Sequence, residues 1–135
     1  MEFHMGNGDD LFKRKNNGFT FIELMVVMAI IATIIAIAMP RYFDGFERSK
    51  ETALKQNLKE MREAIDHYHA DKGEYPANLQ TLVSERYLRF IPADPVTEST
   101  DTWQIITPPG NNSRVYDVTS GATTTSRSGE AYNTW

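Results

Sequence analysis

The sequence predicts an α+β fold, in which one long N-terminal helix packs on a small antiparallel sheet near the C-terminus. Three observations support it. The run from Leu24 to Met39 is apolar except for Thr33, apolar residues then recur at helical spacing, and two short β-type segments follow a stretch rich in turns. A chain of 135 residues has room for one globular domain. It contains no cysteine, and its net charge of −4 argues against nucleic-acid binding as its main function.

The first half of the predicted helix has the length and composition of a membrane span. Phe19 to Met39 is interrupted only by Thr20, Glu23 and Thr33. A bilayer core requires about 20 apolar residues in a helix, and the remaining chain is too short to cover such a helix on all sides. The basic residues 13–15 precede the segment, so we expect the N-terminus in the cytoplasm and the C-terminal part across the membrane.

Glu23 is the one charge inside this segment. A carboxylate in a membrane helix costs roughly 2.5–3.5 kcal/mol on insertion scales. One interpretation is that Glu23 lies near the helix end and reaches the headgroups. The interpretation we favour is that Glu23 pairs with a cationic group, because acidic residues inside membranes are usually paired.

The residues Gly18-Phe19-Thr20-Phe21-Ile22-Glu23-Leu24, followed by the apolar run, resemble the processing site of type IV pilin-like proteins. The resemblance implies that residues 1–18, or 5–18 if Met5 is the initiator, form a leader that prepilin peptidase removes after Gly18. It also implies N-methylation of the new N-terminus at Phe19. Cleavage creates a positive amine at Phe19, which is the partner expected for Glu23 of a neighbouring subunit. Residues 19–40 would then serve as membrane anchor and filament core.

Beyond the membrane segment, Pro40 predicts a helix break or kink because proline removes a backbone donor. An apolar stripe resumes afterwards, and the helix is predicted to end at Lys72, with Gly73 in the C′ position. Three opposite-charge pairs at i,i+4 are predicted on the wet face, Glu51–Lys55, Lys59–Glu63 and Arg62–Asp66. The stripe consists of Leu54, Leu58, Met61, Ile65 and Tyr68.

The C-terminal half predicts smaller elements. Asn78 is placed to cap a short helix over residues 79–87, and residues 91–96 read as an extended stretch between prolines. Residues 103–107 and 115–119 read as paired strands joined by a loop. Tyr132 and Trp135 offer apolar anchors for a polar tail.

This half resembles the major pseudopilin of type II secretion systems, through the GEYP turn, the IPADP stretch, the Trp that follows and the YDV segment. The resemblance implies a structural subunit with a periplasmic domain over residues 41–135, anchored in the inner membrane. The subunit would polymerise into a periplasmic pseudopilus that drives export of folded proteins. The implied partners are further copies, minor pseudopilins, the prepilin peptidase, an inner-membrane assembly platform, secreted proteins and membrane lipid.

The residues predict no cofactor and no catalytic constellation. Major pseudopilins commonly bind calcium in an acidic C-terminal loop, but here Asp101 and Asp117 are the weak candidates, and both also fit turn or surface positions. His67 and His69 are two residues apart, so they diverge on a helix. We therefore expect a protein that is not an enzyme.

Two alternatives remain open on the sequence. The first is the major pilin of a surface type IV pilus, used for adhesion or motility; the absence of cysteine and the IPADP stretch argue against it. The second is a single-pass membrane binding protein that never polymerises. An uncut leader and a monomeric state in detergent would favour the second.

Overall fold

The computed structural model describes residues 17–135, which form two compact units with a boundary between Pro40 and Arg41. Helix α1 (Phe21–Lys72) contributes to both units. The second unit adds α2 (Leu79–Ser84), β1 (Gln104–Ile106), β2 (Asp117–Thr119) and the short 3-10 helix η2 (Tyr132–Thr134). The long helix and the small antiparallel sheet confirm the predicted α+β class.

A helix break at Pro40 does not occur, whereas a kink at Pro40 stays a prediction. Pro40 lies inside α1, with helical residues on both sides. Proline removes one hydrogen bond and one turn of regular geometry, whereas the neighbouring turns keep their own hydrogen bonds. A single proline is therefore insufficient to end this helix.

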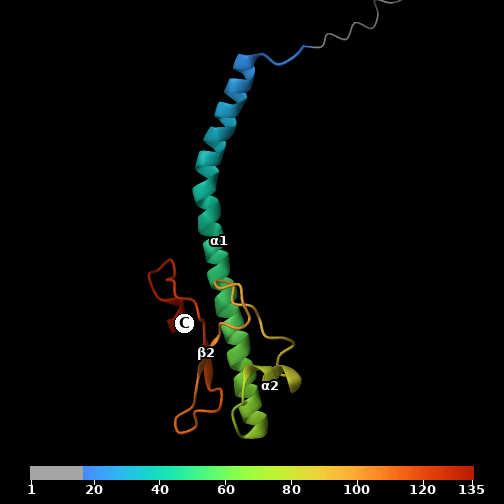
Figure 1. Cartoon of the computed structure of the whole chain (residues 1–135), viewed down its shortest axis with the longest axis vertical. Coiled ribbons are helices and arrows are strands. Elements are labelled where there is room, and N and C mark those ends of the chain that lie inside the picture. The colour runs from blue at the N-terminus through green and yellow to red at the C-terminus, as the bar shows by residue number, and fades with distance from the viewer. Residues whose placement is uncertain (1–16) are drawn as a thin grey trace, which may run out of the picture. The chain divides into compact units, whose positions relative to one another are not determined.

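The core of the second unit forms along one stripe of α1. All five residues of the predicted stripe are buried, which confirms the helical periodicity, and Ala64 joins them. The chain segments that contain α2 and β2 lie on different sides of this part of α1 (Figure 1). Between them they cover the stripe with Leu79, Leu82, Trp103, Val115, Val118, Ala122 and Tyr132.

The C-terminus of α1 and the N-terminus of α2 have the capping residues that the sequence predicts. Gly73 has φ +73°, and its N–H donates to the carbonyl of His69 at 2.9 Å, so Lys72 is the last helical residue, as predicted. Asn78 Oδ1 accepts from the Thr81 N–H at 2.8 Å and caps α2.

Helix α2 ends three residues before the predicted end at Tyr87, because Arg86 takes a left-handed backbone conformation with φ +65°. The Arg86 N–H donates to the Val83 carbonyl at 3.2 Å, and the Tyr87 N–H donates to the Leu82 carbonyl at 2.8 Å. This pair of bonds is the Schellman arrangement that terminates many helices. The position is usually glycine, so the sequence carried no signal for it.

The two predicted strands exist and pair antiparallel, with Gln104 opposite Thr119 and Ile106 opposite Asp117. Each is shorter than predicted by two residues, and Trp103 and Val115, which lie just outside the strands, make contacts to other segments. The Trp103 indole N–H donates to the Pro92 carbonyl at 2.8 Å, and the Val115 N–H donates to the Pro76 carbonyl at 2.8 Å.

The stretch predicted as extended over residues 91–96 instead enters a turn. Asp94 and Ser99 form an antiparallel bridge around the turn residues 95–98. The Asp94 side chain is fully buried; it accepts from the Val96 N–H at 2.8 Å and from the Ser120 hydroxyl. The carboxylate therefore organises the turn from inside, through contacts that hydropathy does not reveal.

Of the three predicted helix-surface ion pairs, only Lys59–Glu63 forms, at 3.9 Å. The Glu51 carboxylate instead accepts from the Arg127 N–H at 2.8 Å and from the Tyr132 hydroxyl at 3.2 Å. Arg62 pairs with Asp117. Contacts to the C-terminal segment displace the local pairs, because an exposed i,i+4 pair contributes only about 0.3–0.5 kcal/mol.

Candidate functional site

The predicted cleavage site precedes the first turn of α1. Residues 17–20 are non-helical and exposed. A β-carbon added at Gly18 would meet nothing within 4 Å, and the Phe19 side chain is 85% exposed. The peptide bond between Gly18 and Phe19 thus lies in an uncovered, non-helical segment directly before a helix. Cleavage there remains a prediction.

Thr20 and Glu23 form a reciprocal cap at the start of α1. The Glu23 N–H donates to Thr20 Oγ1 at 3.2 Å, and the Thr20 N–H donates to Glu23 Oε2 at 3.3 Å. This is a capping box, in which an N-cap threonine and a glutamate three residues later satisfy two backbone donors. Sequence reasoning missed it, although the Thr-x-x-Glu spacing was available.

The cap gives the Glu23 carboxylate a structural function within its own chain. Glu23 lies in the first turn of α1, where the positive end of the helix dipole stabilises an anion. One amide donor is weak compensation for a carboxylate in hydrocarbon. Glu23 is therefore held at a defined position while it retains capacity for a cationic partner.

The apolar half of α1 is uncovered within the residues that the structure describes. It is long and apolar enough to cross a membrane, and none of its most apolar window is buried. Large apolar side chains are exposed along its length, for example Phe21 at 79%, Ile30 at 54% and Ile37 at 62%. The apolar half of α1 therefore differs from the second half of the same helix, which buries one face in the core of the second unit.

The single polar residue of the apolar block is satisfied inside the helix. Thr33 Oγ1 donates to the Ala29 carbonyl at 2.8 Å. Back-bonding of this kind lets a hydroxyl lie in an apolar environment without an external partner. The block as a whole thus presents hydrocarbon on every side, and the charge of Glu23 lies directly before its first residue.

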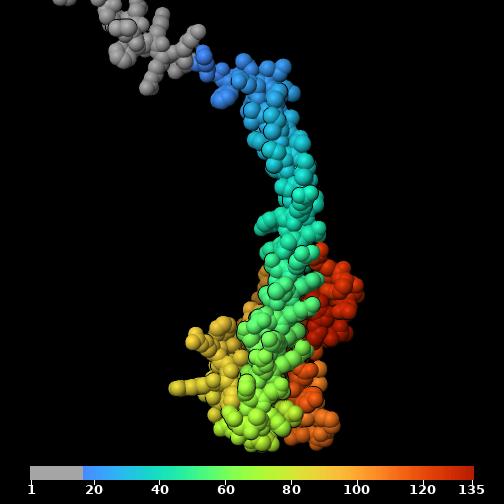
Figure 2. Space-filling model, turned by 180° about the vertical axis from the view of Figure 1, so that it is seen from behind, coloured from blue at the N-terminus to red at the C-terminus, as the bar shows by residue number. Residues whose placement is uncertain are grey.

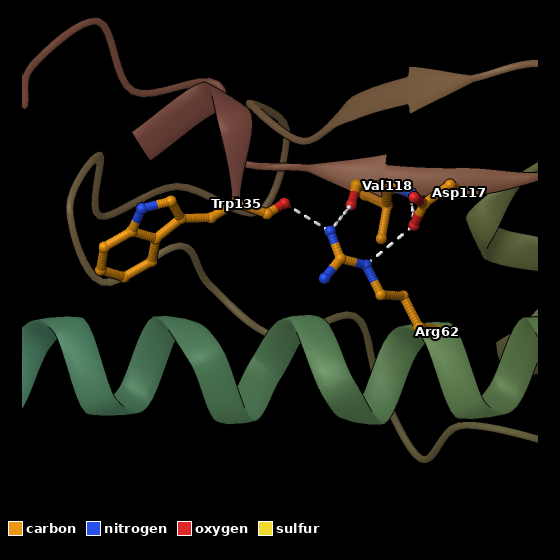
Figure 3. A network of polar contacts seen from close by, with 4 residues as sticks. All are labelled: Arg62, Asp117, Val118 and Trp135. Carbon is orange, nitrogen blue, oxygen red and sulfur yellow. Dashed lines mark hydrogen bonds and ion pairs between the residues drawn. The ribbon is translucent and has the colours of Figure 1, made fainter. Parts of the chain in front are cut away.

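Asp117, a predicted calcium candidate, is engaged elsewhere. The Arg62 Nε donates to Asp117 Oδ1 at 2.8 Å, and the Val118 N–H donates to the same oxygen at 2.7 Å (Figure 3). The Arg62 Nη2 also donates to the Val118 carbonyl at 3.0 Å and to the backbone oxygen of Trp135 (Figure 3). A guanidinium at this carboxylate disfavours a second cation there.

The other candidate ligands are dispersed. Asp101 is exposed, and its backbone N–H donates to Ser99 Oγ at 3.1 Å as part of a turn. His69 stacks on Tyr75, with ring centroids 4.2 Å apart. Within residues 17–135, no three His, Cys, Asp or Glu side chains are grouped to hold a metal ion. Asp101 and Asp117 therefore do not belong to a cluster of three such side chains among these residues.

Comparison with known proteins connects the N-terminal geometry to a known motif. Residues 13–39 match the model of the prokaryotic N-terminal methylation motif. The chain is 42% identical over 81 residues to the type IV major pilin protein PilA of Myxococcus xanthus, an alignment that covers 58% of this chain and 37% of the relative. No solved structure gave a significant match.

Relatives of a second kind align over more of their own length. The chain is 29% identical over 99 residues to the type II secretion system core protein G of Pseudomonas aeruginosa, covering 62% of this chain and 70% of the relative. Core protein G of Escherichia coli is 28% identical over 97 residues, covering 60% and 67%. By contrast, the chain spans less than half of the first two curated relatives, at 37% and 44% of their length.

Proposed function

We propose that this chain, which carries the N-terminal methylation motif of type IV pilin-like proteins, is a structural subunit that polymerises into the pseudopilus of a type II secretion system. The observation that carries the proposal is the apolar half of α1, which is uncovered on every side and begins at a capped carboxylate. Such a helix requires an apolar environment, which a bilayer supplies before assembly and neighbouring helices supply after it.

Processing would create the cationic partner of Glu23. Cleavage after Gly18 turns Phe19 into an N-terminal residue with a positive amine. In the filament core this amine pairs with Glu23 of a neighbouring subunit, and the capping box holds the carboxylate at the helix start until then. Because a buried unpaired carboxylate is costly, the pair selects one axial register for each incoming subunit.

The orientation follows from the charges that flank the apolar block. Basic residues 13–15 keep the leader in the cytoplasm, where a membrane-embedded peptidase and an assembly platform act. The unit that begins at Arg41 lies in the periplasm and forms the outside of the filament. Its partners are further copies, minor pseudopilins and the secreted proteins.

Alignment coverage favours the secretion pseudopilus over a surface pilus. The core protein G alignments reach 70% and 67% of those relatives, whereas the alignment with the Myxococcus pilin reaches 37% of that protein. The higher identity to the pilin, 42%, keeps a type IV pilus subunit as the second candidate. Long surface fibres under the microscope, with secretion intact in a deletion strain, would favour the pilus.

The proposal is tested with two substitutions at Glu23. Glu23→Gln keeps an oxygen for the Thr20 N–H and removes the charge, whereas Glu23→Ala removes both. We expect both variants to insert and to be processed, and both to lose most filament assembly, because assembly depends on the charge. If Glu23→Gln forms filaments as well as the parent, the carboxylate acts only as a helix cap and the pairing is overturned.

Processing has its own test and control. Mass measurement of the N-terminal peptide should show an N-methylated Phe19 in the parent chain. Gly18→Leu should leave the leader attached, because its side chain would obstruct a site that is now open. Asn17→Leu, one residue earlier, is the matched control and should be cut. An uncut parent chain that remains monomeric in detergent would support the non-polymerising anchor instead.

A further inference from the structure

The first turns of the second unit carry three large aromatic side chains that the fold leaves uncovered. Tyr42 is 68% exposed, Phe43 56% and Phe46 48%. In Figure 2 the helix at the start of this unit, in turquoise, is bare, and the yellow and red segments lie against α1 only farther along the chain. Burial of rings of this size is a large favourable contribution in a folded protein. Three exposed rings in close succession therefore indicate a contact surface.

The rings and one cation occupy a single face of the helix. At about 100° per residue, Tyr42, Phe46 and Lys50 follow one another along this face, and Phe43 lies at its edge. The Tyr42 and Phe46 rings are stacked with their centroids 6.4 Å apart, and Lys50 Nζ lies 4.8 Å from the Phe46 centroid. We call these four side chains the aromatic face.

The opposite side of the same turns is charged. Asp44 and Arg48 each lie about 160° around the helix from Phe46, and both are exposed. The helix is thus amphipathic over this short stretch. Aromatic rings with a lysine on one side and exposed charges on the other are typical of helical segments that lie at a membrane surface.

The aromatic face lies where the expected membrane span ends. From Glu23 to Pro40 a helix rises about 26 Å at 1.5 Å per residue, and the hydrocarbon core of a bilayer is about 30 Å thick. From Tyr42 to Phe46 it rises about 6 Å more, whereas the polar layer of each leaflet is about 5–7 Å thick. The rings therefore follow the apolar block at the level of the lipid headgroups.

The chemistry of this face favours phospholipid over a second copy of the chain. Helices that pair inside membranes approach each other through small residues, whereas aromatic rings at the end of a span are typical of contact with headgroups. Two aromatic faces brought together would also bring Lys50 of one copy towards Lys50 of the other. A layer of lipid phosphates attracts the same ammonium group.

We propose that the aromatic face lies in the headgroup layer of the periplasmic leaflet, with the rings at the edge of the acyl chains, Lys50 at the phosphates, and Asp44 and Arg48 towards water. This inference rests on the membrane insertion that the proposed function includes, and it does not depend on filament assembly. Contact at this level would resist sliding of α1 through the bilayer. It would thereby keep Phe19 and Glu23 at the cytoplasmic edge of the membrane until assembly begins.

The chain has no cysteine, so single cysteines can carry an environment-sensitive fluorescent label. Phe46→Cys, Asp44→Cys and Arg48→Cys are each labelled in the full chain and placed in vesicles of phosphatidylcholine and phosphatidylglycerol that contain headgroup-spin-labelled lipid. Quenching should be stronger at position 46 than at both controls. Position 44 is nearer to the membrane span, so depth alone would give the order 44, 46, 48, and that order would overturn the proposed face.

A label in the apolar block separates this inference from the proposed function. Ile30→Cys reports insertion, through quenching by lipid that is spin-labelled deep in its acyl chains. Quenching at position 30 without the preference for position 46 overturns the headgroup contact and leaves the membrane span in place. Absence of quenching at position 30 overturns both. Pyrene at position 46 tests the second copy: excimer emission that persists as the protein is diluted with lipid overturns the lipid contact.

The contribution of Lys50 has a test of its own. Quenching at position 46 should increase with the fraction of phosphatidylglycerol, because the anionic headgroup attracts the ammonium. Lys50→Glu should lose this dependence. Arg48→Glu makes the same change of charge two residues earlier on the opposite side of the helix, so it is the matched control and should keep the dependence. Loss in both variants, or in neither, overturns the assigned contact of Lys50.

Discussion

Arg62 and Asp117 join the C-terminal half of α1 to the start of β2, across 55 positions in the sequence, through a 2.8 Å hydrogen bond between Nε and Oδ1. The same guanidinium donates to the backbone oxygens of Val118 and Trp135 (Figure 3). The Arg62 side chain thus connects both β2 and the C-terminal residue to α1 through hydrogen bonds. Lysine cannot reproduce this, because its ammonium lacks the planar fork that reaches several acceptors at once.

We therefore expect Arg62→Lys to lower the free energy of unfolding by about 1–2 kcal/mol, since hydrogen bonds to charged groups contribute roughly 1.5–3 kcal/mol and this pair is partly exposed. Urea unfolding of the full chain in detergent, followed by tryptophan fluorescence, measures the change. Lys59→Gln is the control at an exposed pair and should stay within about 0.5 kcal/mol. Equal losses in the free energy of unfolding for the two variants would contradict a stabilising function of the Arg62 hydrogen bonds.

Gly121 is required by a close approach of two backbone segments. A β-carbon at this position would lie 1.8 Å from the Thr102 carbonyl oxygen, and backbone cannot move aside as a flexible side chain can. Gly121→Ala should destabilise the second unit by about 1–3 kcal/mol, the usual range for overpacking. Gly45→Ala is the matched control, because nothing lies within 4 Å of that β-carbon and the position is helical. It should stabilise by about 0.8–1 kcal/mol, and thermal unfolding of both variants distinguishes the two signs.

Asp94 is buried and accepts hydrogen bonds from Val96 and Ser120. Asp94→Ala should lower stability by about 2–3 kcal/mol, because it leaves enclosed donors without an acceptor. Asp101→Ala removes an exposed carboxylate from the same region of chain and should change stability by less than about 0.5 kcal/mol. If the two substitutions have similar effects on urea unfolding, Asp94 does not organise the turn.

The pKa of Tyr132 is raised to about 12 by burial, by the negative charge of Glu51 and by the hydrogen bond to that carboxylate. The folded chain therefore keeps this phenol neutral while the unfolded chain ionises near pH 10. Its contribution to stability is complete below pH 10 and is lost as the pH rises from about 10 to 12. In Glu51→Gln the pKa should fall only part of the way towards 10, because burial, the largest cause, remains. Tyrosinate absorbance during an alkaline titration measures it, with Tyr132→Phe identifying the signal.

Local patterns in the sequence predicted the elements that depend on neighbouring residues. The 4-3-4-3 stripe ending at Tyr68, the Gly73 terminus and the Asn78 cap were all correct, because each is determined within one or two turns. The Thr20–Glu23 cap had an equally local signal and was overlooked because Glu23 was considered only as a membrane charge.

Contacts between distant segments were not predictable from the sequence. Glu51 and Arg62 each had a partner at i,i+4, and both bind the C-terminal segment instead. The fold buries Asp94 against Ser120, a contact between residues 26 positions apart that no local pattern in the sequence indicates. The pocket that Trp135 forms with residues Lys55, Leu58 and Lys59 of α1 also depends on how the C-terminal segment packs on the helix, so no local pattern predicts it.

The tail contacts have a consequence for the order of folding. Glu51 binds the Arg127 amide and the Tyr132 hydroxyl, across 76 and 81 positions, whereas α1 needs only local hydrogen bonds. Contacts that close such long loops form late, after the entropy of closure has been overcome. A copy of the chain whose C-terminal segment has not yet docked therefore has a complete α1, while the part of the apolar stripe that Tyr132 and Trp135 cover is still exposed to solvent.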